Sequence, residues 1–276
     1  MPPSLGELQR ARERALALSD TAPIASPTDA ELFLAKVGVA LRYGPGKSLP
    51  LASLFQATRE KSKDSPRLNA AAFTNHLLEK AEGIEVTVVA GRLAVVHRSL
   101  MPALYVLVRR GRAIDDLDGL SMDARVAHRL LQREREVTAG EVRTELGRKF
   151  DGRHDPAYEA LAELQNLLLV DRGPYEMREK GIHYLSEQGY PYHFFHEAHA
   201  DLVRAAGKLD ALKAADAFVR GYLDGAVFCA VRTLKSLFKM FLVKEEIDRT
   251  LARLEAAGRL RVRKIESQTV AISSTF

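Results

Sequence analysis

The sequence contains one cysteine, no tryptophan and no long apolar run. A single cysteine, Cys229, excludes an internal disulfide and a cysteine cage around zinc. No apolar stretch approaches the roughly 18 residues of a membrane span, and the first residues lack the apolar core of a secretory signal. These absences favour a cytoplasmic protein that does not associate with a membrane.

The residues that are present are typical of an ordinary globular protein. The 276 residues are 46% hydrophobic and 28% charged, which is enough for two or three small cores. Lysine and arginine number 41 against 36 acidic residues, so the net charge is +5. This moderate excess is compatible with a polyanionic partner but does not identify one.

The most informative pattern lies near the carboxyl end of the sequence. Between residues 243 and 257, apolar side chains beginning with Val243 recur at helical spacing on one face, and charged and polar side chains, Thr250 among them, lie opposite. Gly258 suits the end of this helix because glycine tolerates a left-handed conformation. Residues 259–264 then alternate, so their arginines share one face of a strand, and residues 270–272 suit a returning strand. Helices followed by such a hairpin predict a winged helix with a basic wing.

The chain before the middle of the sequence contains an arm and a first cluster of helices. Residues 1–28 hold one charged amphipathic stretch and a segment rich in proline, serine and threonine, which favours a frayed arm or a docking helix. Three helical patterns follow, at about 29–41, 49–60 and 66–82. Two apolar strands around a tight turn come next, so the order is again helices and then a hairpin.

A linker rich in glycine and aspartate, residues 111–119, precedes a second cluster of helices. Ser121, Thr138 and Asp155 stand where N-caps are expected, in front of three helical patterns. Residues 169–170 suit the strand that follows the third helix. This cluster therefore resembles the one at the carboxyl end.

We predict an α+β, mainly helical fold with about three tandem winged-helix domains, each with its own small core. The predicted parts are an arm, a winged-helix-like domain, a second winged-helix domain, an aromatic and histidine-rich connector and a third winged-helix domain. They occupy residues 1–28, 29–112, 113–180, 181–209 and 210–276.

Three pairs of landmarks carry a resemblance to a known family. They are residues 92–96 with 100–105, 156–165 with 168–170, and 247–251 with 254–260. Over about residues 29–272 the chain resembles the AlkZ-like family of winged-helix DNA glycosylases, and more closely its AlkZ-related branch. The resemblance implies tandem winged helices that enclose a concave DNA-binding surface and, in active members, removal of alkylated or crosslinked bases.

Active members of that family carry a Gln-x-Gln or Gln-x-Asp motif that positions a water molecule. The glutamines of this sequence are isolated, so no such pair is present. We therefore carry over no catalytic residue, and we predict no cofactor.

The basic side chains of the third predicted domain are the expected DNA contacts. Residues 210–276 contain twelve lysines and arginines against eight acids. If the helix enters the major groove, Arg249 and Arg253 lie nearest the bases, and the other basic residues contact phosphates. The alternative is an ordinary solvated face, because acidic residues lie among the basic ones. The predicted DNA-binding residues are Arg232, Lys235, Lys239, Lys244, Arg249, Arg253, Arg259, Arg261 and Arg263.

The corresponding helix of the second predicted domain is acidic. Glu159, Glu163 and Asn166 lie on the face opposite Leu161 and Leu164. Carboxylates repel phosphate, so we expect this helix to pack against a neighbouring domain or a protein partner.

Three other groups carry weaker signals. His193, His196 and His199 suggest a metal site, but in a helix the first and last point about 240° apart around the axis, so all three cannot bind one ion. We favour an aromatic connector packed between domains, with stacking on unpaired bases as the alternative. The loop at 43–48 lacks the first glycine of a phosphate-binding loop. The aspartates at 115–118 suit a solvated linker, and we predict no metal.

The function that we favour is binding of double-stranded DNA, in particular of damaged or distorted duplex, without catalysis. One alternative is a DNA glycosylase that excises alkylated or crosslinked bases. The other is a protein-interaction scaffold, with the second predicted domain as its contact. A continuous positive cleft favours DNA, whereas an exposed apolar groove favours a scaffold. The sequence does not predict the oligomeric state.

Overall fold

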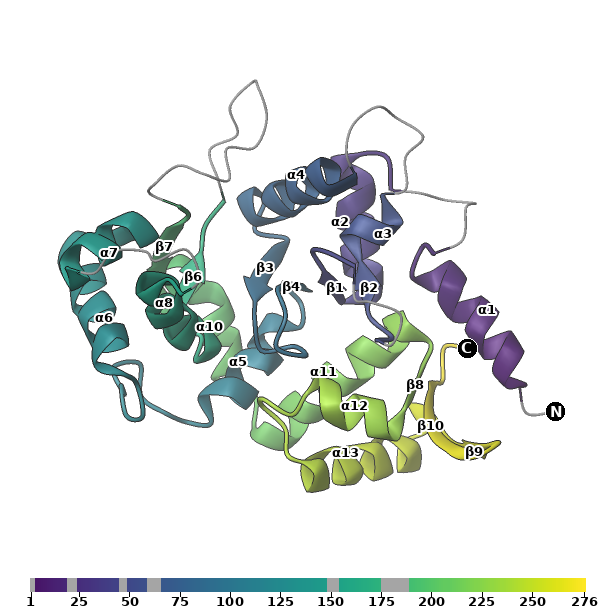
Figure 1. Ribbon diagram of the computed structural model, residues 1–276. Helices are drawn as coiled ribbons and strands as arrows, with labels where there is room; N and C mark the ends of the chain where they lie inside the picture. Colours follow the sequence, from purple (N-terminus) through teal and green to yellow (C-terminus); the bar gives the residue numbers. More distant parts are fainter. Residues whose placement is uncertain (1–2, 19–23, 45–48, 59–65, 148–153, 175–188) are drawn as a thin grey trace.

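The computed structural model describes residues 3–18, 24–44, 49–58, 66–147, 154–174 and 189–276 (Figure 1). Helices predominate, and the strands form three small sheets. Among the described helices, none combines the length and the apolar character that crossing a membrane requires. The fold is therefore α+β and mainly helical, as predicted.

The first set of elements forms a sheet with strand order β2-β1-β4-β3, followed by the helix α5 (Met101–Arg109). Ser26 begins this set, because its side chain accepts a hydrogen bond from the amide of Asp29 in a capping box. The elements are α2 (Pro27–Val37), β1 (Val39–Leu41), β2 (Ala52–Ser53), α3 (Leu54–Ala57), α4 (Pro66–Glu79), β3 (Gly83–Val86) and β4 (Ala94–His97).

The second set forms a sheet with strand order β5-β7-β6. Ser121, Thr138 and Asp155 cap its three helices, which confirms the predicted helix starts. The elements are α6 (Met122–Glu134), β5 (Glu136–Thr138), α7 (Ala139–Leu146), α8 (Pro156–Asn166), β6 (Val170–Arg172) and β7 (Pro191–Phe194).

The third set follows two short helices, α9 (Phe195–Ala198) and α10 (Ala200–Ala206), and its strands have the order β8-β10-β9. The helix predicted at 243–257 and the hairpin predicted after it agree with the structure to within two residues at each end. The elements are α11 (Ala211–Ala226), β8 (Phe228–Ala230), α12 (Val231–Leu237), α13 (Lys244–Ala256), β9 (Leu260–Ile265) and β10 (Gln268–Ser273).

The three sets share one order of elements: helix, strand, two helices and then two strands. In each sheet the last strand of the set lies in the middle and pairs with the other two. The first set adds β2, which pairs in parallel with β1. The chain therefore repeats one topology three times.

The prediction of a separate core for each set holds only in part. The second set has its own cluster of buried side chains, and so does one part of the first set, but the remaining buried side chains of the first set form one continuous cluster with those of the third. The reason is that α11 packs closely against the first set through two glycines. An added Cβ at Gly225 would lie 2.3 Å from the carbonyl oxygen of Val37, and one at Gly221 would lie 2.5 Å from Cδ2 of Leu100.

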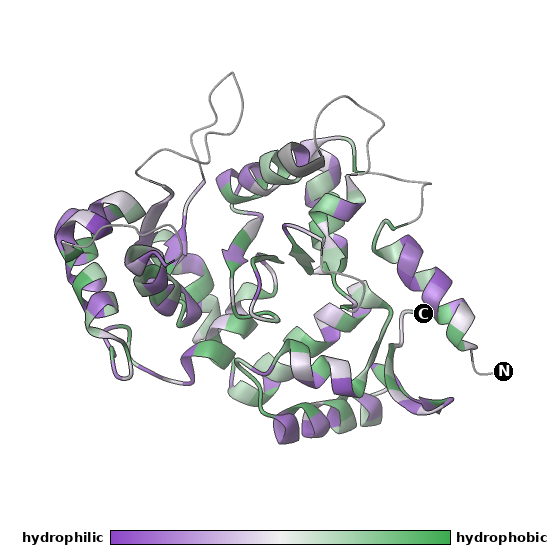
Figure 2. Cartoon of the chain, viewed as in Figure 1, coloured by the Kyte–Doolittle hydropathy of each residue, from purple (hydrophilic) through white to green (hydrophobic). Residues whose placement is uncertain are grey.

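The helix α1 (Leu5–Ala15) packs against the sheet of the third set, beside the carboxyl end of the chain (Figure 1). Leu8 and Ala11 are buried in a cluster with Phe228, Val270 and Ile272. The guanidinium of Arg12 also lies 4.3 Å from the centre of the Phe228 ring. Figure 2 shows that α1 carries hydrophilic residues beside hydrophobic ones, as a helix docked on one face requires. The arm is thus a docking helix.

Other predicted boundaries differ from the structure. The helix expected at 29–41 ends at Val37, and β1 follows it. Residues 39–41 are all buried, and a short apolar run has the same appearance in a helix and in a buried strand. The helix expected at 49–60 is replaced by β2 and the short α3. The connector expected at 181–209 includes β7, which is the central strand of the second sheet.

Candidate nucleic-acid interface

The third set contains a hollow of about 1160 Å³ bounded by α12, the start of α13 and the turn of the β9–β10 hairpin. We call it the basic groove. Among the described residues that line it, Glu245 is the only carboxylate. Its four basic lining residues are Arg232, Lys235, Lys239 and Lys244.

Three of these cations are available to a ligand. Arg232, Lys239 and Lys244 are exposed and form no ion pair with any described residue. Lys235 is different, since its Nζ lies 2.6 Å from Oδ2 of Asp248. Two carboxylates, including Glu245, lie in the first turn of α13 and offset the positive end of that helix. The positive charge of the groove therefore comes from side chains, mainly those on and after α12.

Two predicted base contacts on α13 have other partners. Arg253 binds α11, because its Nη2 lies 2.7 Å from Oδ1 of Asp216. It also donates to the hydroxyl of Thr250, which is fully buried, although we expected this threonine on the free face. Arg249 is exposed and donates to the carbonyl oxygen of Glu245 on its own helix. Val243, expected on the packed face, is 55% exposed because it precedes the helix as its N-cap.

The arginines of the hairpin share one face of β9, as predicted. Arg261 pairs across the strands with Ile272, and Arg263 pairs with Val270, so both arginines share a face with residues that α1 covers. Arg263 also lies 3.1 Å from a carboxylate oxygen of Glu255. Arg259 is exposed and lies just before the strand, which begins at Leu260. The structure thus brings four of the nine predicted DNA contacts into the basic groove and places the other five elsewhere.

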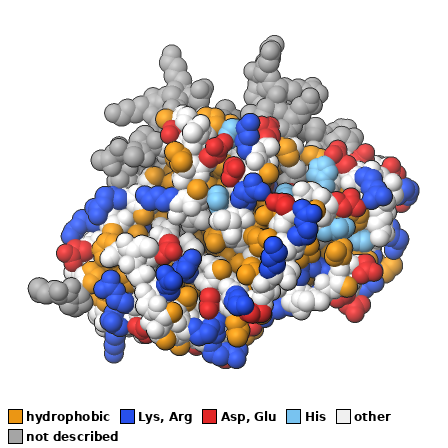
Figure 3. All heavy atoms as spheres, turned by 180° about the vertical axis from the view of Figure 1, so that it is seen from behind, with side chains coloured by type: hydrophobic (Ala, Val, Ile, Leu, Met, Phe, Trp, Pro, Cys, Tyr) orange, Lys and Arg blue, Asp and Glu red, His pale blue; other side chains and the backbone are white. Residues whose placement is uncertain are grey.

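On the face of the molecule seen in Figure 3, basic side chains lie among acidic and apolar ones rather than in a continuous strip. The distribution of charge on this face therefore does not by itself mark a DNA-binding surface, and the candidate interface is identified from the local arrangement of side chains.

A residue that the sequence analysis did not single out fixes the orientation of α13. Arg110, at the end of α5, contacts Glu246 with both terminal nitrogens, at 2.5 and 2.8 Å, and donates to the carbonyl oxygen of Phe241 at 2.5 Å. The hydrogen bonds from Arg110 lower the pKa of Glu246 to about 2. This ion pair joins the first set to the helix that borders the basic groove.

The Arg110–Glu246 pair predicts a pH-dependent stability. A carboxylate whose pKa is lowered in the folded state stabilises the fold at pH values above its ordinary pKa of 4.5. This contribution is lost as the pH falls from 4.5 towards 2. Because both side chains are partly exposed, we expect Glu246→Gln to lower the free energy of unfolding by only about 1–2 kcal/mol at pH 7. Urea denaturation from pH 7 to pH 2.5 checks this. A difference from wild type that stays constant over this range would contradict the ion-pair explanation.

A buried polar network joins the sheets of the first and second sets. The carboxylate of Glu85, on β3, accepts a hydrogen bond from Arg172, at the end of β6. Nη1 of Arg42 lies 3.7 Å from the same carboxylate and donates to the hydroxyl of Tyr190 at 2.5 Å. The guanidinium of Arg172 lies 4.0 Å from the centre of the Tyr190 ring. Burial alone lowers the pKa of Arg172, but the charge of Glu85, its hydrogen bond and the nearby Tyr192 and Tyr190 together raise the pKa above its ordinary value, so the arginine stays charged.

The end of the acidic helix α8 contacts the first set, whereas Glu159 and Glu163 of its predicted packing face do not. Gln165 donates to the carbonyl oxygen of Glu85 at 2.9 Å, and Thr87 donates to Oδ1 of Asn166 at 2.5 Å. Glu163 accepts a hydrogen bond from the amide of Ser121. The end of this helix is therefore not available to DNA.

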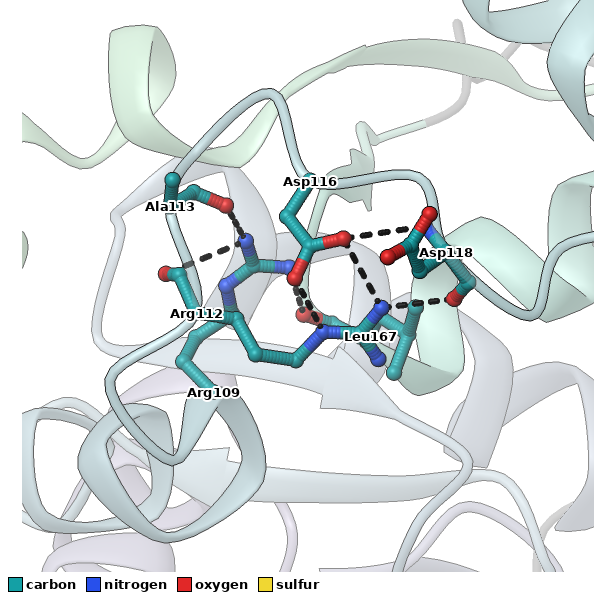
Figure 4. A network of polar contacts seen from close by, with 6 residues as sticks. All are labelled: Arg109, Arg112, Ala113, Asp116, Asp118 and Leu167. Atoms are coloured by element: carbon teal, nitrogen blue, oxygen red, sulfur yellow. Dashed lines mark hydrogen bonds and ion pairs between the residues drawn. The ribbon is translucent and has the colours of Figure 1, made fainter.

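The linker between the first two sets is held by two arginines (Figure 4). Arg109 is buried and donates to the carbonyl oxygens of Ala113 and Leu167. Arg112 contacts the carboxylate of Asp116 at 2.9 Å, and its hydrogen bonds lower the pKa of Asp116 to about 2. This aspartate, expected in a solvated linker, is thus part of an ordered network.

The histidines of the predicted connector face different carboxylates. His199 lies 2.6 Å from Asp171, whereas His193 lies 3.5 Å from Glu136. Within the described residues, no group of three or more side chains of metal-binding type could hold an ion. The aromatic residues pack as expected, since Phe195 stacks on Tyr105 of α5 with ring centres 5.3 Å apart. His183, Tyr184 and residues 45–48 of the glycine-containing loop lie outside the described residues.

No family model and no curated protein matches the sequence. Among solved structures, the chain is similar to the DNA glycosylase AlkZ of Streptomyces sahachiroi, with a TM-score of 0.60 and 14% identity. The match covers 100% of this chain and 71% of the other. At this identity the similarity concerns the fold alone: the chain has a distant AlkZ-like fold.

Proposed function

We propose that this protein binds double-stranded DNA and that it is built of three winged helices, in which α4, α8 and α13 hold the position of the recognition helix. The order of elements, repeated three times with the last strand in the middle of each sheet, supports the winged-helix assignment. The solved structure with a similar fold is that of a DNA glycosylase.

The basic groove is the observation that carries the proposal. It presents Arg232, Lys239 and Lys244, none of which forms an ion pair with a described residue. Unpaired, exposed cations around a hollow suit phosphate oxygens, which position a protein on a duplex without reading its sequence. The third winged helix would therefore supply most of the phosphate contacts, while the second is turned towards the first set.

Damaged or distorted duplex is the substrate class that we propose, and we propose binding without catalysis. The similarity to a DNA glycosylase supports the first point. The lack of paired glutamines, which active members of the AlkZ-like family carry, supports the second.

Binding to intact, abasic and alkylated duplexes should be measured by fluorescence anisotropy across a salt series. The three phosphate contacts of the basic groove are expected to contribute about −2.7 to the slope of log affinity against log salt concentration, from about −0.9 for each contact. Product gels on the same samples report base release. Release of a modified base would replace the non-catalytic proposal with a glycosylase, whereas no binding to any duplex would favour the protein-interaction scaffold.

A further inference from the structure

A second basic hollow, of about 620 Å³, lies between α1 and the base of β9. Arg10 and Arg14 line it from α1, and Arg261 lines it from β9. The two helix residues are four positions apart, so they share one face of α1. All three arginines are exposed, and none of their side chains forms an ion pair or a hydrogen bond with another described residue.

Glu7 is the one side-chain carboxylate among the described residues that line this hollow, and it is already engaged. Glu7 accepts hydrogen bonds from the amide and the hydroxyl of Ser4, at 2.7 and 2.9 Å, as part of the capping box of α1. These hydrogen bonds lower the pKa of Glu7, so it stays ionised as a cap. Three guanidiniums therefore face one side-chain carboxylate with a local role, and the side chains around the hollow keep an excess of positive charge.

The helix α1 holds its two arginines in place. Leu8 is fully buried against the outer face of the third sheet, and Arg12 lies over the Phe228 ring at 4.3 Å. Arg261 belongs to that sheet and is opposite Ile272, which α1 covers. The three arginines therefore come from two packed elements rather than from a free arm, which lowers the entropy cost of binding an anion.

The hollow and the basic groove lie along the same hairpin. Ile272, the partner of Arg261, is four residues from Gln268, which lines the groove, and four residues of strand span about 14 Å. Duplex DNA carries one phosphate per roughly 1.7 Å of its axis, or about eight over that length. A duplex that lies along the hairpin would thus present phosphates to both places.

We infer that Arg10, Arg14 and Arg261 form a second phosphate-binding surface, which we call the α1 surface, for duplex DNA that lies along the β9–β10 hairpin. Arginine suits this role because its planar guanidinium binds two phosphate oxygens at once. The inference rests on the proposed function, and it gives the first helix of the chain a part in DNA binding.

The double variant Arg10→Ala, Arg14→Ala tests the α1 surface. Loss of two phosphate contacts is expected to make the slope of log affinity against log salt less steep by about 1.8, with roughly tenfold weaker binding to a 30-base-pair duplex. Both side chains are exposed, so circular dichroism and the melting temperature should match wild type. The variant Arg10→Lys, Arg14→Lys keeps both charges and is expected to retain most of the slope.

A charge-matched control separates the surface from general electrostatics. The double variant Arg133→Ala, Arg135→Ala removes the same number of charges. These two arginines belong to the second set, and each forms an ion pair with a carboxylate. An unchanged slope for the α1 alanine variant, with binding still weakened by groove substitutions, would overturn the α1 surface and leave the proposed function standing. An equal loss in the control would also overturn it. If wild-type protein binds no duplex, both proposals fail.

Discussion

Glu85→Ala is expected to lower the free energy of unfolding by about 3–5 kcal/mol, because removing one partner of a buried ion pair leaves charge without compensation. The Glu85 side chain is 0% exposed, and the side chains of Arg42 and Arg172 that face it are 3% and 8% exposed. Without this carboxylate, burial of Arg172 would be opposed by its full desolvation cost. Urea denaturation followed by circular dichroism at pH 7 measures the effect.

The matched control is a similar pair on the surface. Glu197 lies 2.9 Å from Nη1 of Arg135, but these side chains are 44% and 73% exposed. Water screens such a pair, so Glu197→Ala should cost only about 0–1 kcal/mol. Comparable losses in the two variants would show that the buried network does not hold the first and second sets together.

Removing the three unpaired cations of the basic groove is expected to have the largest effect on DNA binding. For the triple variant Arg232→Ala, Lys239→Ala, Lys244→Ala, about 1 kcal/mol for each lost contact gives roughly 150-fold weaker binding. The salt slope should become less steep by about 2.7. Fluorescence anisotropy with one duplex at several salt concentrations measures both quantities.

A second triple variant removes the same charge elsewhere. Arg135, Lys213 and Arg220 each face a carboxylate at the surface, and none of them lines the groove. Their replacement by alanine should weaken binding only slightly. If the two triple variants lose affinity equally, the contact depends on net charge and the groove has no special role.

Local signals in the sequence were sufficient for the helix starts and for the last hairpin. Caps such as Ser121 and Thr138 act within four residues, and the alternation in β9 follows from the strand repeat alone. The boundary between α2 and β1 was predicted wrongly, because residues 39–41 are buried whichever structure they adopt. Short-range patterns therefore identify single elements better than the boundaries inside an apolar run.

The candidate site was predicted only in part, for a related reason. A pattern shows which side of an element carries charge, but it does not show which elements meet. Arg253 was expected at the DNA and instead binds Asp216, which lies 37 residues earlier on α11. Arg42 and Tyr190 are 148 residues apart and meet in the buried network. Arg10 and Arg14 carried a readable signal, two basic residues at helical spacing, but the partner of their helix could not be inferred.

The position of α1 has a consequence for how the chain folds. Leu8 and Phe228 belong to one buried cluster although about 220 residues of sequence separate them. Such a long-range contact forms only after a long loop closes. During synthesis the helix emerges before the sheet that it covers. The apolar face of α1, with Leu8 and Ala11, must therefore wait until that sheet has been made, and until then it is open to association with other molecules.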